Sequence, residues 1–245
     1  MVYKGRIIGL GLTKEGNPVA VYAISGRSDN SKKRVAKYFD EGYTKRVFID
    51  SWGEPTEEQK RKADIYFYNA MKMFGDLVDG LPYLAISNGV HTDTIANVRH
   101  ATPDNNNTVL KTLKLFGPEP DTLHTARIGG ELNMHLESKY ASIGIIPYST
   151  TDLVACDAIN FSELKKGEVR TISTYSGLDD SNPAAPEFKK LEDVIERWEL
   201  DGKTAGELAG NVYNKIDPNL VVCTVAAVWN GTFWDVAVKN MHGDK

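Results

Sequence analysis

The chain has 245 residues, with 29 Lys and Arg against 33 Asp and Glu, and a net charge of -4 at pH 7. This acidic balance argues against a general nucleic-acid-binding protein, which carries a basic excess, and no apolar run approaches the roughly 20 residues that span a membrane. We therefore predict a cytoplasmic protein that folds as one domain over residues 1–245. The histidines and the two cysteines show no metal-ligand spacing, so neither a disulfide framework nor a metal site is predicted.

The first part of the chain is rich in strand-forming residues. The run that begins at Pro18 is apolar almost throughout, which is typical of a strand covered on both faces. Thr56 with Gln59 makes a capping box, so a helix should start there. The strands predicted in this part span residues 5–12, 18–25, 45–50, from about 66, and 83–87.

The second part begins with helical patterns over residues 96–100 and 108–116. A sheet-rich block follows, with strands predicted over residues 126–132, 139–146, 152–158 and 168–175. Two further helices are predicted over residues 187–199 and 204–215. Asn230-Gly231 should turn a closing hairpin, whose strands are predicted over residues 220–229 and 233–238.

A loop dense in hydroxyls and cations is predicted over residues 25–34. Arg27 on one side and a basic run at its end could clamp a phosphate, with serine hydroxyls beside them. A solvated basic loop explains the same residues, and the sequence alone slightly favours that interpretation over the phosphate clamp.

Polar groups crowd together where the apolar run 83–86 stops. Asn88-Gly89 is a common two-residue hairpin turn, and Thr92 or Asp93 can simply cap a helix. A strand end that presents oriented N–H groups and an amide side chain to a ligand fits the same residues. Taken alone, this stretch favours the turn.

Several short motifs become informative when they are read together in chain order. They are Tyr3-x-Gly5-Arg6, Ser25-x-Arg27-Ser28, Tyr68-Asn69, Ser87-Asn88-Gly89-x-His91-Thr92-Asp93-Thr94-Ile95, Thr125-x-Arg127-Ile128, Ser173-Thr174-Tyr175 and Pro183-Ala184-Ala185-x-Glu187-Phe188. In this order the chain resembles the archaeal-type inosine monophosphate cyclohydrolases. Each motif is weak alone, but their ordered succession spans most of the chain and is specific.

The resemblance implies an α+β fold, a four-layer αββα sandwich like that of the N-terminal-nucleophile hydrolases. Those hydrolases use an N-terminal Cys, Ser or Thr, whereas this chain begins Met1-Val2-Tyr3, so an amide hydrolase of that type is not expected. The implied reaction closes 5-formamidoimidazole-4-carboxamide ribonucleotide, here called the formamido nucleotide, to inosine monophosphate with loss of water, in purine synthesis.

The implied partner is therefore a purine nucleotide, with no cofactor and no metal, and a homo-oligomer is one arrangement that the sequence leaves open. The alternative function is a purine-nucleotide-binding protein of the same fold whose chemistry has been lost or redirected.

The resemblance also implies the catalytic positions. The catalytic tyrosine of the family falls on Tyr68, and its acidic residue falls on Glu119, counted back from Arg127. The basic loop is longer here than in the family, so the catalytic cation falls on Arg34 if the extra residues are an insertion and on Lys32 if they are not. We prefer Arg34. The implied substrate-binding residues are Arg6, Arg27, Ser28, Asn88, Gly89, Asp93 and Arg127.

Two of these positions, and His91 beside them, carry expectations from their chemistry. Arg127 lies on an apolar strand, where an unpaired charge is costly, so it should meet an acidic side chain or the ligand phosphate. Asn88 offers both a donor and an acceptor to the carboxamide or the base of the substrate. His91 is predicted to be a hydrogen-bonded structural residue rather than a ligand.

Overall fold

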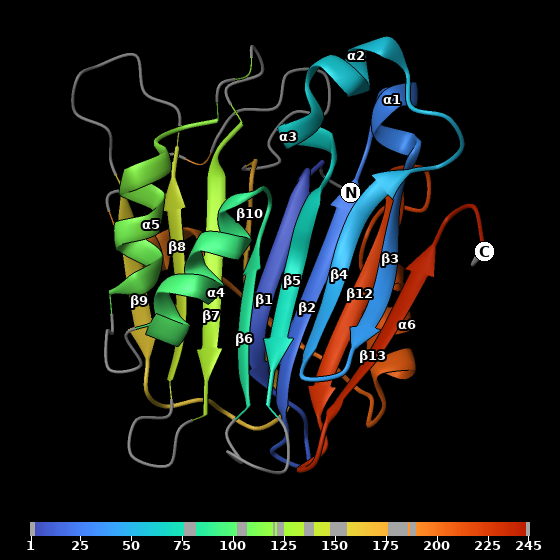
Figure 1. Cartoon of the computed structure of the whole chain (residues 1–245). Coiled ribbons are helices and arrows are strands. Elements are labelled where there is room, and N and C mark those ends of the chain that lie inside the picture. The colour runs from blue at the N-terminus through green and yellow to red at the C-terminus, as the bar shows by residue number, and fades with distance from the viewer. Residues whose placement is uncertain are drawn as a thin grey trace.

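The structure is a computed structural model, which describes residues 3–75, 82–101, 107–119, 121, 125–134, 140–147, 156–175, 186 and 190–243, apart from the side chain of His100. The strands form two antiparallel sheets (Figure 1). The order in the six-stranded sheet is β11 (Glu196–Glu199), β10 (Glu168–Ser173), β1 (Arg6–Leu12), β2 (Pro18–Ser25), β12 (Val221–Trp229) and β13 (Trp234–Asn240). The order in the seven-stranded sheet is β3 (Arg34–Glu41), β4 (Thr44–Ser51), β5 (Tyr68–Phe74), β6 (Tyr83–Ser87), β7 (Arg127–Asn133), β8 (Tyr140–Ile146) and β9 (Asp157–Phe161).

The main hydrophobic core lies between the two sheets. Ile8 and Tyr22 from one sheet belong to the same buried cluster as Ile49 and Ile86 from the other. Every residue of β2 is buried, which confirms the predicted strand with two covered faces. Successive side chains of such a strand serve two different cores, so an apolar residue is needed at almost every position.

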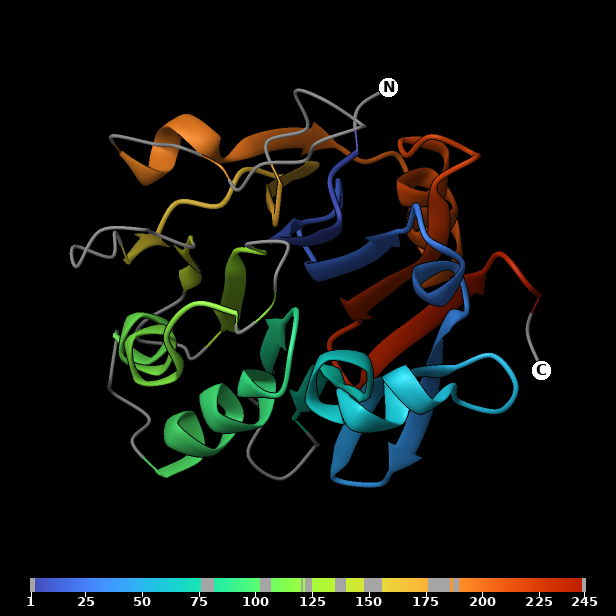
Figure 2. The ribbon, with the colours of Figure 1, turned by 90° about the horizontal axis from the view of Figure 1, so that it is seen from above.

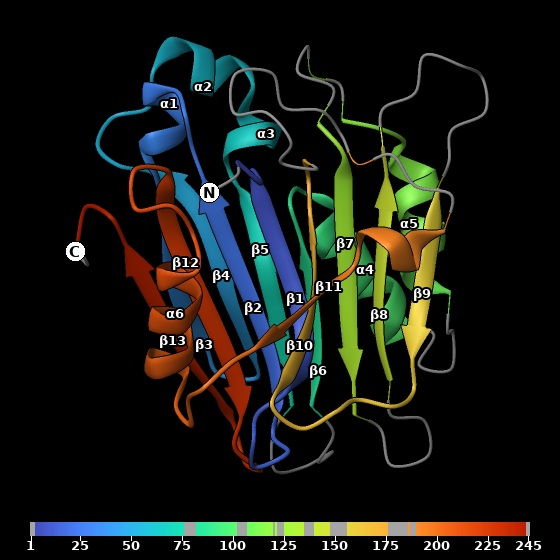
Figure 3. The same cartoon turned by 180° about the vertical axis from the view of Figure 1, so that it is seen from behind.

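Helices cover part of each outer face (Figures 1 and 3). α6 (Ala205–Asn214) packs Leu208 and Val212 on the outer face of the six-stranded sheet. α4 (His91–Ala101) and α5 (Thr108–Phe116) cover the seven-stranded sheet and bury Leu113. Among the described helices, none is long and apolar enough to cross a membrane.

Three short helices gather instead at one end of the sheets (Figures 1 and 2). They are α1 (Asp29–Lys32), α2 (Glu57–Arg61) and α3 (Ala63–Tyr66). Because neighbouring strands run antiparallel, the strands with odd numbers from β1 to β7 all begin at this end. Their first residues are Arg6, Arg34, Tyr68 and Arg127. Polar residues distant in sequence are therefore brought together at the edge of the core.

The predicted four-layer αββα sandwich is wrong. The body of the molecule is two antiparallel sheets, and the described helices do not form two continuous outer layers. In that part of the chain the six-stranded sheet carries α6, a helix of 10 residues, on its outer face. α1, α2 and α3 lie at the strand ends rather than on a sheet. The resemblance supplied these layers, whereas the local sequence pattern pointed only to sheets with grouped helices.

The predicted helix over residues 187–199 is also wrong in its described part. Leu191–Val194 is a 3₁₀ turn, and Glu196–Glu199 is strand β11, which pairs with β10. The apolar stripe that predicted a helix is short enough for tertiary pairing to override it. Residues 187–189 lie outside the described part.

The other elements agree more closely with the predictions. The two predicted hairpins form as β1–β2 and β12–β13, and the capping box of Thr56 and Gln59 starts α2. The prediction missed β3, whose residues after Ala36 are exposed and show no apolar alternation. β9 begins at Asp157, later than predicted, and residues 152–155 lie outside the described part.

Candidate active site

A pocket of about 610 Å³ opens at the end of the sheets where α1, α2 and α3 lie. This volume is typical of sites for small molecules. Its lining is rich in basic, hydroxyl and aromatic side chains, among them Tyr3, Arg6, Arg27, Ser28, Arg34, Tyr66, Thr125 and Tyr175.

Two buried arginines form the most unusual feature of this pocket. Arg6 is 8% exposed and Arg34 is 6% exposed, and the Nε atom of each has no hydrogen-bond partner among the described residues. Arg34 donates from Nη2 to the Ile65 carbonyl at 3.4 Å, and its guanidinium lies 4.6 Å from the Tyr66 ring centroid. Burial and the neighbouring Arg6 charge lower the pKa of Arg34. Two buried like charges with open N–H donors call for an anion or an oxygen-rich ligand.

The structure also distinguishes the two candidates for the catalytic cation of the basic loop. Arg34 begins β3 and lines the pocket, whereas Lys32 lies in the last turn of α1 and is not part of the lining. α1 fills the loop before Arg34 and ends at Lys32.

Tyr68 lies at the inner end of the same region and contacts the opposite sheet. Its hydroxyl is 2.8 Å from the hydroxyl of Tyr22, and the two side chains are 2% and 0% exposed. Burial by itself would lower the pKa of Arg6. The oxygens of Tyr68, Tyr22 and Glu119 together raise this pKa by more than burial lowers it, so these three side chains lie within electrostatic range of the Arg6 guanidinium. Sequence reasoning missed Tyr22, for which the available signal was a tyrosine in the interior of an otherwise apolar stretch of β2.

Glu119 connects this group to Arg127. Its Oε2 atom is 3.4 Å from Arg127 Nη2, and the carboxyl side chain is largely buried. The prediction that Arg127 meets an acidic side chain is confirmed. Burial raises the pKa of Glu119, although the charges of Arg127 and Arg6 oppose the shift. A side chain at Gly89 would place its Cβ 3.3 Å from Glu119 Oε1, so the chain after β6 borders the carboxyl group closely.

Asn88 has protein partners for both of its polar side-chain atoms. Nδ2 donates to the Ala126 carbonyl at 3.0 Å, and Oδ1 accepts from the Ile128 N–H at 2.8 Å. The side chain thus joins the end of β6 to the start of β7. Asn88-Gly89 leads into α4 rather than a second strand, so it is not the turn of a hairpin.

His91 is buried, as predicted for a structural residue. Nδ1 lies 3.2 Å from Arg127 Nη1, and Nε2 lies 2.9 Å from the Ile128 carbonyl. Burial and the Arg127 charge lower the pKa of His91 to about 3, so the ring is neutral and accepts from Arg127 while donating to the carbonyl.

Asp93 lies away from Tyr68. Asn69 Nδ2 donates to both carboxylate oxygens of Asp93, at 3.0 and 3.1 Å, and Lys72 lies 3.1 Å from Oδ1. Neighbouring residues of a strand point to opposite faces, so Asn69 faces α4 while Tyr68 faces the core. Asp93 therefore fixes the first turn of α4 to β5.

Arg27 and Ser28 lie at the mouth of the pocket. The Arg27 guanidinium is 4.6 Å from the Tyr3 ring centroid, and Tyr3 stacks on Tyr175. Ser28 is exposed and caps α1 by accepting from the Ser31 N–H. Part of the predicted loop is thus a helix. The motif over residues 183–188, which contributed to the family resemblance, lies outside the described part apart from Pro186.

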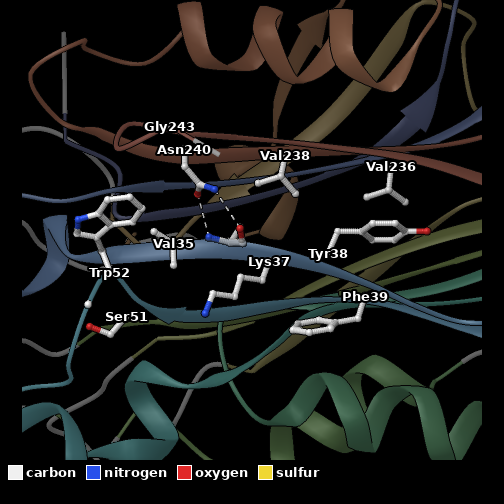
Figure 4. Close-up of a pocket in the computed structure, with 12 residues that line it drawn as sticks. Val35, Lys37, Tyr38, Phe39, Ser51, Trp52, Val236, Val238, Asn240 and Gly243 are labelled. Atoms are coloured by element: carbon white, nitrogen blue, oxygen red, sulfur yellow. Dashed lines mark hydrogen bonds between the residues drawn. The ribbon is translucent and has the colours of Figure 1, made fainter. Parts of the chain in front are cut away.

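A second cavity, a groove of about 590 Å³, lies between the edge strands β3 and β13 (Figure 4). Its lining includes Val35, Val236 and Val238, with the side chains of Tyr38 and Phe39 nearby on β3. The charged residue in its described lining is Lys37, which is exposed and pairs with Asp50 at 2.7 Å. The Asn240 side chain accepts from Ala36 N–H and donates to the Ala36 carbonyl, so its polar atoms are satisfied.

A buried acid lies under α4, away from both cavities. Glu131 is 0% exposed and accepts hydrogen bonds from Tyr83 at 3.3 Å and Tyr140 at 3.1 Å. Arg99 lies at 4.0 Å. Burial raises the pKa of Glu131 to about 6, against the opposing effects of Arg99 and the two hydroxyls.

The described residues hold no group of three or more His, Cys, Asp or Glu side chains placed to bind a metal ion. Cys156 and Cys223 are free thiols.

Comparison with known proteins decides the family. A family model described as IMP cyclohydrolase-like protein matches residues 3–232. The chain belongs to the IMP cyclohydrolase-like protein family. The family predicted from the ordered motifs is therefore confirmed.

Three relatives named IMP cyclohydrolase match along nearly their whole length. The protein from Methanosphaera stadtmanae is 25% identical over 241 residues, which covers 98% of this chain and 100% of the relative. The proteins from Methanococcus maripaludis and Methanocaldococcus jannaschii are 27% and 25% identical, and the matches cover 91% and 93% of this chain and 94% of each relative.

In this member of the IMP cyclohydrolase-like family, the structure sorts the predicted site residues into two groups. One group lies in or beside the pocket of about 610 Å³, here called the charged pocket. It comprises Arg6, Arg27, Ser28, Arg34, Tyr68, Gly89, Glu119 and Arg127. The other group, Asn88 and Asp93, makes its hydrogen bonds to neighbouring protein atoms and holds β6 and α4 in place.

Proposed function

We propose that the protein is an IMP cyclohydrolase, an enzyme that closes the formamido nucleotide to inosine monophosphate with loss of water. The observation that carries the proposal is the pair of buried guanidiniums, Arg6 and Arg34, with unpartnered Nε atoms beside Tyr68. Such donors fit the carbonyl oxygens and developing oxyanion of this substrate. Family membership supports the same reaction.

The reaction is intramolecular, so the enzyme mainly holds two substituents of the imidazole ring in contact. The carboxamide nitrogen attacks the formyl carbon, Glu119 takes a proton from this nitrogen, and Tyr68 gives its proton to the former formyl oxygen. The raised pKa of Glu119 makes it a stronger base than an exposed carboxylate. Arg6 and Arg34 stabilise the negative charge on the oxygen while the carbon–nitrogen bond forms.

Loss of water completes the ring. Glu119 returns its proton to the hydroxyl group, which leaves as water, while the former formamide nitrogen loses its proton to the Tyr68 oxygen and the carbon–nitrogen double bond forms. Both side chains recover their starting protonation states. The balance requires no cofactor.

The mouth of the pocket suits the phosphate group of the nucleotide. Arg27 is held against Tyr3 and can form two parallel hydrogen bonds to a phosphate, with the Ser28 hydroxyl beside it. Arg127 acts through Glu119, and the absence of a side chain at Gly89 leaves room beside that carboxyl group. Asn88 and Asp93 support the site by holding its strands and α4.

We extend the proposal to the whole chain, which we take as one domain because both sheets contribute to the pocket. The proposed partner is a purine nucleotide. The homo-oligomer and the cytoplasmic location stay predictions.

The test is to incubate the purified protein, freed of metal with a chelator, with the formamido nucleotide and to follow inosine monophosphate by chromatography. The expected result is repeated turnover. A protein that binds inosine monophosphate but converts no substrate would instead be the nucleotide-binding protein whose chemistry has been lost.

A further inference from the structure

The hydroxyls of Tyr22 and Tyr68 form an isolated pair between the two sheets. Tyr22 comes from β2 and Tyr68 from β5, and the two oxygens are 2.8 Å apart. Neither hydroxyl has another hydrogen-bond partner among the described residues. The pair therefore has two protons to place and, within the protein, one contact in which to place them.

The position of these protons can be worked out from burial. Tyr22 is 0% exposed and lies deep in the core between the sheets, where it reaches no solvent. If Tyr68 donated to Tyr22, the Tyr22 proton would be buried without an acceptor among the described residues, which is unfavourable. If Tyr22 donates to Tyr68, the Tyr68 proton is the one left without an acceptor among the described residues, and it is free to be donated to a ligand in the pocket beside Arg6. The second arrangement is the favourable one whenever the pocket holds an acceptor.

Burial and the neighbouring Tyr68 oxygen raise the pKa of Tyr22 well above its ordinary value, so this hydroxyl keeps its proton throughout the working range of pH. It is a permanent donor. The charged and titratable groups around the pair are Arg6, Arg34, Tyr66, Glu119 and Cys223.

We propose that Tyr22 is a positioning residue for the reaction. It donates a hydrogen bond to the Tyr68 oxygen, directs the Tyr68 proton into the pocket, and stabilises the negative charge that appears on Tyr68 once this proton has moved to the former formyl oxygen. The O–H bond of Tyr68 breaks, an O–H bond forms on the substrate, and the charge stays on Tyr68 until the formamide proton returns to it. This inference rests on the proposed function.

The test is the variant Tyr22→Phe, which removes one oxygen and keeps the ring. Loss of a hydrogen bond to a charged group corresponds to a fall in kcat of about 10- to 100-fold, with KM within about twofold of the original value. A fall in kcat with KM retained is expected because the lost donor acts on the Tyr68 oxygen during the reaction rather than on substrate binding.

The matched control is Tyr140→Phe. Tyr140 is also a buried tyrosine, but its hydroxyl donates to Glu131, outside the pocket. This variant is expected to lose stability and to keep both kcat and KM. Thermal unfolding of both variants shows whether they fold.

A second measurement separates this inference from the proposed function. The ζ-carbon of Tyr68, labelled with ¹³C-tyrosine and assigned with Tyr68→Phe, is observed by NMR in the ligand-free protein, because its resonance reports the hydrogen bond that the Tyr68 oxygen accepts. A shift of this resonance in Tyr22→Phe, with none in Tyr140→Phe, supports the inference even if the protein does not convert the formamido nucleotide. Unchanged kcat, or a Tyr68 resonance that is the same in the wild type and in Tyr22→Phe, would overturn it.

Discussion

The charged pocket and the groove between β3 and β13 enclose nearly equal volumes, about 610 and 590 Å³. They differ in the state of their polar groups. The pocket buries Arg6 and Arg34 with open Nε donors, whereas Lys37 in the groove is exposed and paired, and Asn240 is satisfied. Burying an uncompensated charge is expensive, so a fold retains one where a ligand supplies the missing partner. The comparison teaches that these two cavities differ in unmet hydrogen-bonding capacity rather than in volume.

The largest effect is expected from Tyr68→Phe. Removing the proton donor should lower kcat by about 10²- to 10⁴-fold, with a much smaller change in KM. Tyr38→Phe, in the groove, should leave both constants unchanged. Steady-state kinetics on the formamido nucleotide check this prediction, and similar effects of the two variants would remove the distinction between the cavities.

Glu119→Gln should be nearly as damaging, with a fall in kcat of about 10²-fold because the proposed base is lost. The wild-type rate should decline as pH falls through the raised pKa of Glu119, since the protonated carboxyl cannot accept a proton. The residual activity of the variant should lack this acid limb. Asp50→Asn, beside the groove, serves as the control, and an acid limb that persists in Glu119→Gln would assign the base to another residue.

Arg27→Ala should weaken binding more than turnover. Loss of a charge-assisted hydrogen bond corresponds to an increase in the Kd of inosine monophosphate of about 10- to 100-fold. Lys37→Ala removes a cation from the groove and should not change this Kd. Isothermal titration calorimetry measures both, and equal affinities for the two variants would show that the mouth of the pocket does not hold the phosphate.

The smallest effect on turnover is expected at Glu131. It tests whether a buried charged group marks a functional site even when its hydrogen bonds are satisfied. Glu131 is buried but hydrogen-bonded, so Glu131→Gln should change stability rather than turnover. Its pKa is raised from 4.5 to about 6, so the folded state binds the proton more tightly than the unfolded state, and stability from this group falls as pH rises between these values. The shift corresponds to about 2 kcal/mol.

Urea unfolding at pH 4.5 and above pH 6 measures this difference. Relative to the wild type, Glu131→Gln should gain about 2 kcal/mol over this interval, whereas Glu57→Gln, an exposed glutamate, should gain nothing. A flat difference for Glu131→Gln would show that this carboxyl has an ordinary pKa.

Local patterns predicted the hairpins and the helix cap, because turn residues and capping boxes act over a few neighbouring residues. β3 and β11 were missed because their pairing depends on distant partners: β11 is set by β10, and most of β3 is exposed. The layers of the fold were inferred from resemblance, and the structure corrects them.

The site residues likewise divide into those that the resemblance implied and those whose contacts depend on the tertiary structure. The resemblance implied Arg6, Arg34, Tyr68 and Glu119 as site residues. The first three begin β1, β3 and β5, and Glu119 lies in the connection between α5 and β7, where it pairs with Arg127. Asp93 points elsewhere because a shift of one residue along β5, from Tyr68 to Asn69, changes the face of the sheet. The contact of Tyr22 with Tyr68 crosses between sheets, and no local pattern in either strand carries it.

The most direct test of the central claim is a crystal structure of the protein with inosine monophosphate bound. The account predicts that the nucleotide occupies the charged pocket, with an oxygen of the base within hydrogen-bond distance of Arg6 or Arg34 and the phosphate beside Arg27. A nucleotide bound in the groove, or one that leaves both buried guanidiniums without a partner, would contradict it.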